Sequence, residues 1–313
     1  MHTDTVIVRP LEPEGDLDGL LSLLAAVARA EGKTSSPTAD QMRAAFAQPN
    51  FYRWVAVASD EPAAPVGYGI LVQQTPDRCY GDVKVHPARR RQGIGRLVMD
   101  QLAVQAAALG TRYLTIDVAA ANQDALRFLL SQGFRFRGDV WGLELPADAE
   151  LPGPVWPERY SVRSLDEVDD LSLFVALCNR TFGDLWGHWE NTPGLVDEAR
   201  MGEWLAESDP RGVFVVFDPV GAPVAQCRTF PAAAGSDAAT PHTLDQPGVV
   251  PTHRDRELHL PLALTAAAWL RDRARRAVRL NSWGDARETI AGYETAGFAP
   301  VEHEVSYVRE VGV

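Results

Sequence analysis

Apolar positions in the first half of the chain recur with two different spacings. Leu17, Leu20, Leu21 and Leu24 follow the three- and four-residue spacing of an amphipathic helix. Short apolar runs bounded by turn residues are typical of strands. Together the patterns predict strands at 5–9, 54–58, 67–72, 79–85, 112–118 and from 134 onward, and helices at 16–30, 39–46, 93–109 and 122–131.

This order places helices between strands, so we expect an α/β protein (an α+β mixed sheet) with a central mixed β-sheet flanked by helices. A proline-rich stretch, "LPADAELPGPVWPERY", follows at residues 145–160 and suits neither a helix nor a sheet. We therefore predict an N-terminal domain at 1–145, a linker at 146–158 and a C-terminal domain at 159–313. At roughly 150 residues per domain, 313 residues also suggest two domains.

The second half repeats features of the first at a constant offset. "VHPARRRQGIG" from Val85 aligns with "VVPTHRDRELH" from Val249, and Arg90 matches Arg254 (254 − 90 = 164). "LLSQGF" aligns with "YETAGF", and Gly133 matches Gly297 (297 − 133 = 164). The same offset at both ends of some fifty residues indicates a duplicated domain.

The stretch "VKVHPARRRQGIGR" at residues 83–96 is strongly basic. It holds one lysine, four arginines and no acid, although the chain has a net charge of −12. A strand precedes it, and Gly93-Ile94-Gly95 begins a helix, whose N-terminus favours a phosphate. The alternative is a solvated basic turn. Arg96-Leu97 does not fit a Walker loop, and Val98 replaces the third glycine of a dinucleotide fingerprint.

Two motifs resemble the GNAT acyl-CoA-dependent N-acyltransferases. The first is V-x-P-x-x-R-R-x-G-x-G from Val85, and the second is N-x-x-A-x-x-F-L-x-x-x-G-F from Asn122. Tandem members of this length are most similar to the mycothiol-synthase group. The resemblance implies two tandem GNAT domains, acetyl-CoA as acyl donor and no metal. It also implies cofactor binding by Val83, Lys84, Val85, Arg90, Arg91, Gln92, Gly93, Ile94, Gly95, Arg96 and Asn122.

Acyl transfer to an amine needs a base, a donor to the oxyanion and a proton for the leaving thiolate. The resemblance implies that the Val85 N–H is the oxyanion donor. Asp117 is the first candidate base and Asp82 the second, while a solvated or ion-paired carboxylate is the alternative for each. Leu129 stands where the family often has a tyrosine acid. The chain is thus predicted to be an N-acetyltransferase, or else a catalytically silent acyl-CoA-binding sensor.

The second copy has a tyrosine at the acid position but lacks the glycines of the loop. Tyr293 occupies the acid position, but Glu257 and His259 replace the two loop glycines, and Ala286 replaces the asparagine. A glutamate repels a pyrophosphate, and two added Cβ atoms obstruct its approach. We therefore expect no ordinary CoA binding in this half, and we interpret Tyr293 as a packed aromatic residue.

A second stretch of interest, "CNRTFGDLWGHWENTP", contains Trp186, His188, Trp189 and Glu190. Its aromatic rings suit either an apolar or cationic substrate or a packing patch between domains. No Cys or His lies near His188 at metal-ligand spacing, so we expect no metal there.

Composition limits the other functions. A pI of about 5.1 argues against nucleic-acid and anionic-membrane binding. The three cysteines are far apart in the sequence and form no C-x-x-C motif, which predicts reduced, buried thiols; they are Cys79, Cys178 and Cys227. With no signal-peptide pattern and no spanning apolar run, we expect a cytoplasmic location. The expected acceptor is a small-molecule amine, and the protein is expected to be a monomer or a homodimer.

Overall fold

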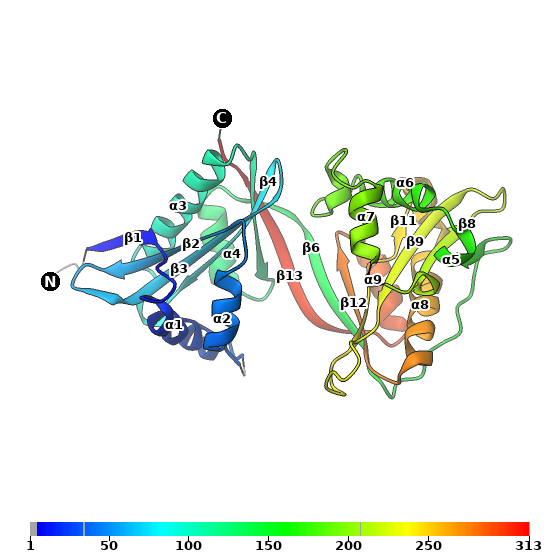
Figure 1. Cartoon of the computed structure of the whole chain (residues 1–313), viewed down its shortest axis with the longest axis horizontal. Helices are drawn as coiled ribbons and strands as arrows, with labels where there is room; N and C mark the ends of the chain where they lie inside the picture. The colour runs from blue at the N-terminus through cyan, green and yellow to red at the C-terminus, as the bar shows by residue number, and fades with distance from the viewer. Residues whose placement is uncertain (1–4, 34, 207, 313) are drawn as a thin grey trace. The chain divides into compact units, whose positions relative to one another are not determined.

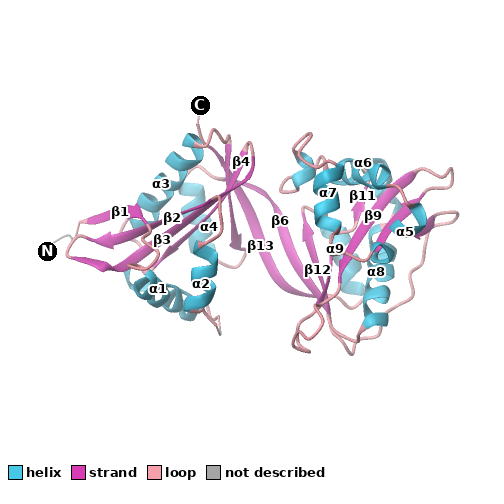
Figure 2. Cartoon of the chain, in the orientation of Figure 1, coloured by secondary structure: helices cyan, strands magenta, loops and turns pink. Residues whose placement is uncertain are grey.

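The computed structural model describes residues 5–33, 35–206 and 208–312. The chain forms two compact units (Figure 1). Unit 1 lies within 1–118, 122–136 and 306–313, and unit 2 consists of 119–121 and 137–305. Each unit combines β-strands with helices packed on them, as Figure 2 shows by colour. The predicted α/β class with a mixed sheet is confirmed.

Unit 1 begins with four antiparallel strands in sequence order, followed by a parallel fifth. Its elements are β1 (Val6–Pro10), α1 (Leu17–Ala30), α2 (Ala39–Phe46), β2 (Phe51–Ala58), β3 (Glu61–Thr75), β4 (Arg78–Val85), α3 (Ile94–Ala108), β5 (Tyr113–Ala119), α4 (Gln123–Ser131) and the start of β6 (Arg135–Leu145). A capping box at Thr38 and Gln41 fixes the start of α2.

Helices cover both faces of this sheet. Leu20 and Leu23 of α1 pack on one face against Val55 and Tyr68. On the other face, Ile94 and Val98 of α3 pack against Ala56. A Cβ at Gly69 would lie 2.5 Å from Val98 Cγ1, so the missing side chain permits this close packing.

The last strand of the chain contributes to the first unit. Residues 306–310 of β13 (Ala299–Glu310) belong to unit 1, and the Val311 N–H donates to the Arg112 carbonyl at 2.8 Å. Residues 137–145 of β6 belong instead to unit 2, where β6 pairs antiparallel with β12 (Val278–Trp283). The boundaries of the compact units therefore do not follow chain order. The domains at 1–145 and 159–313 stay a prediction from the sequence.

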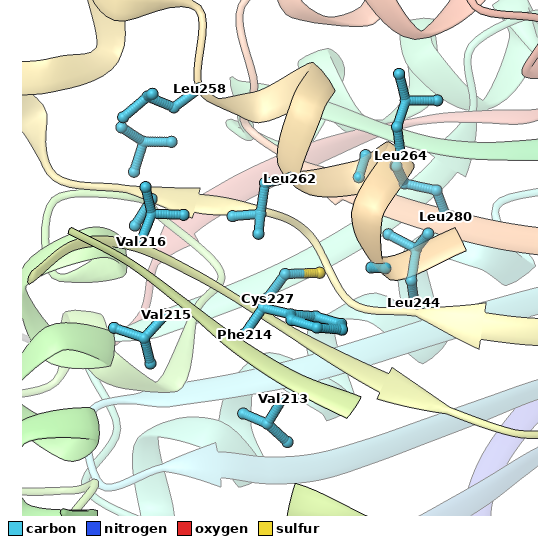
Figure 3. Close-up of a cluster of buried hydrophobic side chains, with 14 of the residues drawn as sticks. Val213, Phe214, Val215, Val216, Cys227, Leu244, Leu258, Leu262, Leu264 and Leu280 are labelled. Carbon is cyan, nitrogen blue, oxygen red and sulfur yellow. The ribbon is translucent and has the colours of Figure 1, made fainter. Parts of the chain in front are cut away.

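Unit 2 repeats the plan. Its further elements are β7 (Ser161–Ser164), α5 (Leu165–Val168), α6 (Leu171–Phe182), α7 (Glu198–Leu205), β8 (Val213–Phe217), β9 (Pro223–Phe230), β10 (His242–Leu244), β11 (Gly248–Val249), α8 (His259–Arg273) and α9 (Arg287–Thr295). Figure 3 shows the core between α8 and strands β8 and β9, where Leu262 and Cys227 belong to one cluster of buried side chains. Burial of such apolar side chains is the main favourable contribution to stability.

Most of the predicted elements lie within three residues of the observed bounds, but β3 differs. The sequence leaves residues 59–66 outside the predicted strands, but Pro62 and Pro65 are part of a longer strand with irregular pairing to β2 between Ala56 and Ala58. Irregular register of this kind accommodates residues that cannot donate to the ladder. No helix within the described ranges is long and apolar enough to cross a membrane.

Candidate functional site

Strands β4 and β5 of unit 1 separate after a short ladder. Their parallel pairing runs from Arg78↔Tyr113 to Tyr80↔Thr115, whereas β4 continues to Val85 and β5 to Ala119. The ends of the two strands therefore diverge beyond Tyr80 and Thr115. Such a divergence exposes backbone groups that a ligand can bind in the manner of an added strand.

The register of β4 shows which backbone groups face this opening. The His86 N–H donates to the Val66 carbonyl of β3 at 2.9 Å. Lys84, two residues earlier, pairs with Tyr68, so its backbone groups are directed toward β3 as well. In an antiparallel ladder the intervening residues direct their N–H and C=O groups away from that partner. The backbone of Val83 and Val85 thus faces the opening, whereas that of Lys84 is directed at β3.

The glycine loop leads directly into α3. Gly93 is the N-cap residue, with φ of +83°, and a Cβ there would meet nothing within 4 Å. Its carbonyl accepts from the Arg96 and Leu97 N–H groups, so the Ile94 and Gly95 N–H groups lie in the first turn, ahead of the helical ladder. This arrangement fits a pyrophosphate, because backbone donors and the helix dipole both favour an anion there.

Gly95 lies close to α4 and to the end of β4. A Cβ built on it would lie 3.4 Å from Phe128 Cζ and 3.6 Å from Val85 Cγ2. These are ordinary van der Waals distances, so the protein's own packing would tolerate a Cβ at this position.

Arg90 already has a partner within the protein. Its Nε donates to the Val85 carbonyl at 3.3 Å, and its Nη2 lies 4.0 Å from Glu31 Oε1. The counterpart Arg254 does the same in unit 2, where Nε donates to the Val249 carbonyl at 3.2 Å and Nη2 lies 2.7 Å from Asp184 Oδ1. The shared arrangement indicates that this arginine holds the end of the strand. The sequence motif alone predicts phosphate binding for it and does not reveal this structural role.

The other predicted cofactor residues surround the loop. Arg91 adopts φ of +65°, and Arg96 lies 3.8 Å from Asp100 with its side chain largely exposed. Gln92 directs its amide toward the Ala88 carbonyl at 3.5 Å. Asn122 caps α4, because its Oδ1 accepts from the Ala125 N–H at 3.1 Å. Its amide nitrogen is thus the side-chain group with which it would donate to a ligand.

Asp117 lies on β5, beyond the last residue that pairs with β4. Burial raises the pKa of its carboxyl, and a hydrogen bond from Ser306 lowers it in part. Its Oδ1 is buried without a hydrogen-bond partner. A carboxyl with a raised pKa and an unused oxygen is typical of a functional group rather than a solvated surface acid. Ser306 could not be recognised from the sequence, since it follows Asp117 by 189 residues (306 − 117).

Asp82 lies on the same face of the sheet but in a different environment. It pairs in register with Ile70, which packs against α1, and its Oδ1 lies 3.1 Å from Lys84 Nζ. Both side chains are about one-third exposed. Asp82 is the weaker candidate base, because its carboxylate already has Lys84 as a partner and is partly exposed.

The acid position differs between the two copies as the sequence predicts. Leu129 is buried in unit 1 and cannot donate a proton. In unit 2, Tyr293 is fully buried, its hydroxyl has no hydrogen-bond partner, and burial raises its pKa well above the usual range. Tyr293 packs edge-to-face on Phe298 at 6.1 Å, as a core aromatic residue does.

We therefore expect Tyr293→Phe to leave acyl-transfer turnover unchanged. The free energy of unfolding should stay constant or rise by about 1 kcal/mol, because the variant removes an unsatisfied buried hydroxyl. Steady-state rates and thermal unfolding check both expectations. A turnover loss of tenfold or more would make Tyr293 a proton donor after all.

The second copy keeps the backbone of the loop but not its chemistry. Glu257 stands at the Gly93 position and adopts φ of +56°, a left-handed conformation that is costly for a residue with a Cβ. His259 stands at the Gly95 position, and burial lowers its pKa to about 4. A carboxylate beside a neutral imidazole offers no favourable charge to a pyrophosphate.

The aromatic stretch after α6 lies around a cavity of about 460 Å³ within unit 2. His188, Trp189 and Glu190 line this cavity, whereas Trp186 packs under the Arg137 guanidinium at 4.7 Å. His188 stacks on Phe182 at 4.2 Å, and burial lowers its pKa. Within the described ranges, no group of three or more His, Cys, Asp or Glu is arranged to hold a metal ion. The three cysteines are free and buried.

Known proteins are similar to this chain in sequence and in fold. Residues 19–134 match the model of the acetyltransferase (GNAT) family. A mycothiol acetyltransferase of Salinispora arenicola is 30% identical over 78% of this chain and 77% of its own length. A GCN5-related N-acetyltransferase of Sphaerobacter thermophilus superposes with a TM-score of 0.75 at 19% identity, covering 98% of this chain and 97% of its own.

A tandem GNAT protein from the clavulanic acid biosynthesis pathway superposes with a TM-score of 0.62 at 21% identity, covering 99% of both chains. The two solved structures share the tandem fold, and the Salinispora relative is similar in sequence. The chain therefore belongs to the GNAT family of N-acetyltransferases, as a tandem member similar to the mycothiol acetyltransferases.

Proposed function

We propose that this enzyme transfers the acetyl group of acetyl-CoA to the primary amine of a small molecule, with acetyl-CoA bound in unit 1. The contrast between the two loops is the observation that carries the proposal. Unit 1 combines diverging strands with Gly93 at the start of α3, whereas unit 2 has Glu257 at the matching position. Only the first combination offers backbone donors to a pyrophosphate without an opposing carboxylate.

Acetyl-CoA supplies an activated thioester, and this chain supplies its orientation. The first turn of α3 and the side chains of Arg91 and Arg96 would hold the pyrophosphate through charge-assisted hydrogen bonds. The backbone of Val83 and Val85 would pair with the pantetheine amides along the opening between β4 and β5. The Asn122 amide would donate to the same arm. Arg90 would hold the end of β4 in place.

In the chemical step, the neutral amine nitrogen attacks the thioester carbonyl carbon, a C–N bond forms and the C–S bond breaks. Asp117 would accept the proton that the amine loses, directly or through a water. The Val85 N–H would donate to the developing oxyanion. The thiolate takes up a proton from water or another group, because Leu129 has none to give.

The acceptor is proposed to be a small molecule for two reasons. The relatives are named mycothiol acetyltransferases, a name that specifies a small-molecule acceptor. Both candidate carboxylates also lie on the face of the sheet that α1 covers. Asp82 pairs with Ile70, which packs on this face. Leu114 lies on the opposite face, beside Leu102 of α3, and strand alternation then places Asp117 on the α1 face. Two acids on one face suit an amine, which approaches as a cation.

A transfer screen tests the proposal. Purified protein, acetyl-CoA and a panel of small primary amines are mixed, and free thiol is followed with a chromogenic reagent. We expect steady thiol release with at least one amine, together with a matching acetylated product by mass spectrometry. Tight acetyl-CoA binding without release for any amine would contradict the proposal and favour a silent acyl-CoA sensor.

A further inference from the structure

The cavity in unit 2 is formed by residues from one unit alone. Its lining comes from the segment after α6, from α7, from the end of β9, from the β10–β11 connection and from β12. The most informative lining residues are Glu190, Trp204, Arg228, Gln246, Asn281 and Trp283. Its volume of about 460 Å³ is within the usual range for small-molecule sites.

The 164-residue offset relates this cavity to the candidate catalytic face of unit 1. Asp82 corresponds to Gln246 (82 + 164), and Asp117 corresponds to Asn281 (117 + 164). Both amides line the cavity. Amides keep the shape and polarity of carboxylates but cannot accept a proton at neutral pH. The second copy thus retains a pocket at the acceptor position while lacking either base.

The walls of the cavity are aromatic and already contact cations. Trp189 and Trp204 pack edge-to-face at 6.3 Å. The Arg200 guanidinium lies 4.3 Å from the Trp189 ring centroid, and that of Arg228 lies 5.4 Å from Trp204. Indole faces attract positive charge, and the attraction increases where water is excluded.

The charges of the lining leave one carboxyl group in excess. Arg228 is matched by Asp245, with Nε at 2.9 Å from Oδ2. Glu190 is 6% exposed, and burial raises the pKa of its carboxyl despite the positive charges of Arg228 and Arg200. A buried carboxyl of this kind gains most from a cationic partner, since a cation offsets the cost of ionisation.

We infer that the cavity of unit 2 is a non-catalytic binding site for a small organic ammonium ion. The ammonium group would donate to Glu190, and the body of the molecule would lie against Trp189, Trp204 and Trp283. The site is separate from the acetyl-CoA site, and ligand binding there requires no acyl transfer.

A charge series on the unmodified protein tests the inference. Benzylamine, benzyl alcohol and benzoate have similar shape but differ in charge. Calorimetry at pH 7.5, without acetyl-CoA, should give benzylamine an affinity at least about tenfold above the other two. Equal binding of benzyl alcohol would overturn the charge assignment, and stronger binding of benzoate would make Arg228 the recognising group.

Variants assign the binding to unit 2. Glu190→Gln should weaken benzylamine about tenfold or more while leaving benzyl alcohol unchanged. Glu203→Gln is the matched control, because Glu203 is an exposed carboxylate on α7 beside Trp204. Thermal unfolding of each variant verifies that it is folded. If Glu190→Gln does not fold, Trp204→Leu replaces it and should weaken benzylamine similarly.

Binding at the face of unit 1 is the main alternative. Asp82→Asn and Asp117→Asn should leave benzylamine affinity unchanged if the inference holds. A loss in either variant, with Glu190→Gln unaffected, would overturn it. The Gly93→Glu variant should also bind benzylamine normally, so failure of the acetyl-CoA site and failure of this site are distinguishable.

Discussion

Glutamate in place of Gly93 should raise the Kd for acetyl-CoA by at least about a hundredfold, because juxtaposed like charges cost several kcal/mol. The substitution gives unit 1 the residue that unit 2 carries as Glu257. It places a carboxylate at the start of α3, where the Ile94 and Gly95 N–H groups would otherwise meet the pyrophosphate. Calorimetric titration with acetyl-CoA measures the effect.

Two controls separate charge from backbone strain. Gly93→Ala adds a Cβ at φ of +83° without charge and should weaken binding far less. Gly110→Glu adds the same charge at φ of +75° after the other end of α3, also with open space around the Cβ. It should cost similar stability but leave the Kd unchanged. Loss of affinity in Gly110→Glu as large as in Gly93→Glu would contradict the phosphate assignment.

Replacing Asp117 by asparagine should lower turnover by roughly a hundredfold or more, the usual scale for losing a general base. Acetyl-CoA affinity should be preserved, because Asp117 lies on β5 and not in the loop that would hold the pyrophosphate. Asp82→Asn is the matched control, since it removes a carboxylate on the same face that pairs with Lys84. Steady-state rates with a confirmed acceptor measure both variants.

The pH dependence gives a second signature. A base works only when ionised, and burial raises the pKa of Asp117. Activity of the unmodified enzyme should therefore be lost, as pH falls, at a higher pH than the ordinary carboxyl pKa of about 3.9. In Asp117→Asn the rate should recover as pH rises, because more of the amine is then neutral. Asp82→Asn should show no such recovery.

Unchanged turnover in both variants would mean that neither acid is the base. Catalysis would then depend on positioning and on the Val85 N–H. An acceptor whose amine is already neutral when it binds would give the same result, so the pKa of the acceptor must be measured alongside. A pH-dependent recovery in Asp82→Asn alone would exchange the roles of the two carboxylates.

Local sequence signals predicted the elements that depend on neighbouring residues. The spacing of Leu17, Leu20 and Leu24 predicts α1 to within one residue, and α2 is predicted with its observed bounds. The sequence likewise predicts the glycine loop, because Gly-x-Gly before a helix is a local signal. In the structure Gly93 adopts φ of +83°, which favours glycine. Such features are set by periodicity and turn chemistry, which a single sequence displays directly.

Features that depend on distant pairing could not be predicted. Residues 306–310 contribute to unit 1, and nothing local at Ser306 indicates that it hydrogen-bonds to Asp117. The cavity in unit 2 was also missed, since Arg228, Gln246 and Asn281 come from three separate strands or connections. The aromatic residues at 186–190 suggested recognition or packing, and only the fold indicates which of them line the cavity.

The stoichiometry of acetyl-CoA binding is the most direct test, because we assign acetyl-CoA to only one of two similar units. Isothermal titration calorimetry of the whole chain should give one acetyl-CoA per chain, and the Gly93→Glu variant should give none. Two equivalent sites per chain, or one site that persists in Gly93→Glu, would contradict the assignment of acetyl-CoA to unit 1.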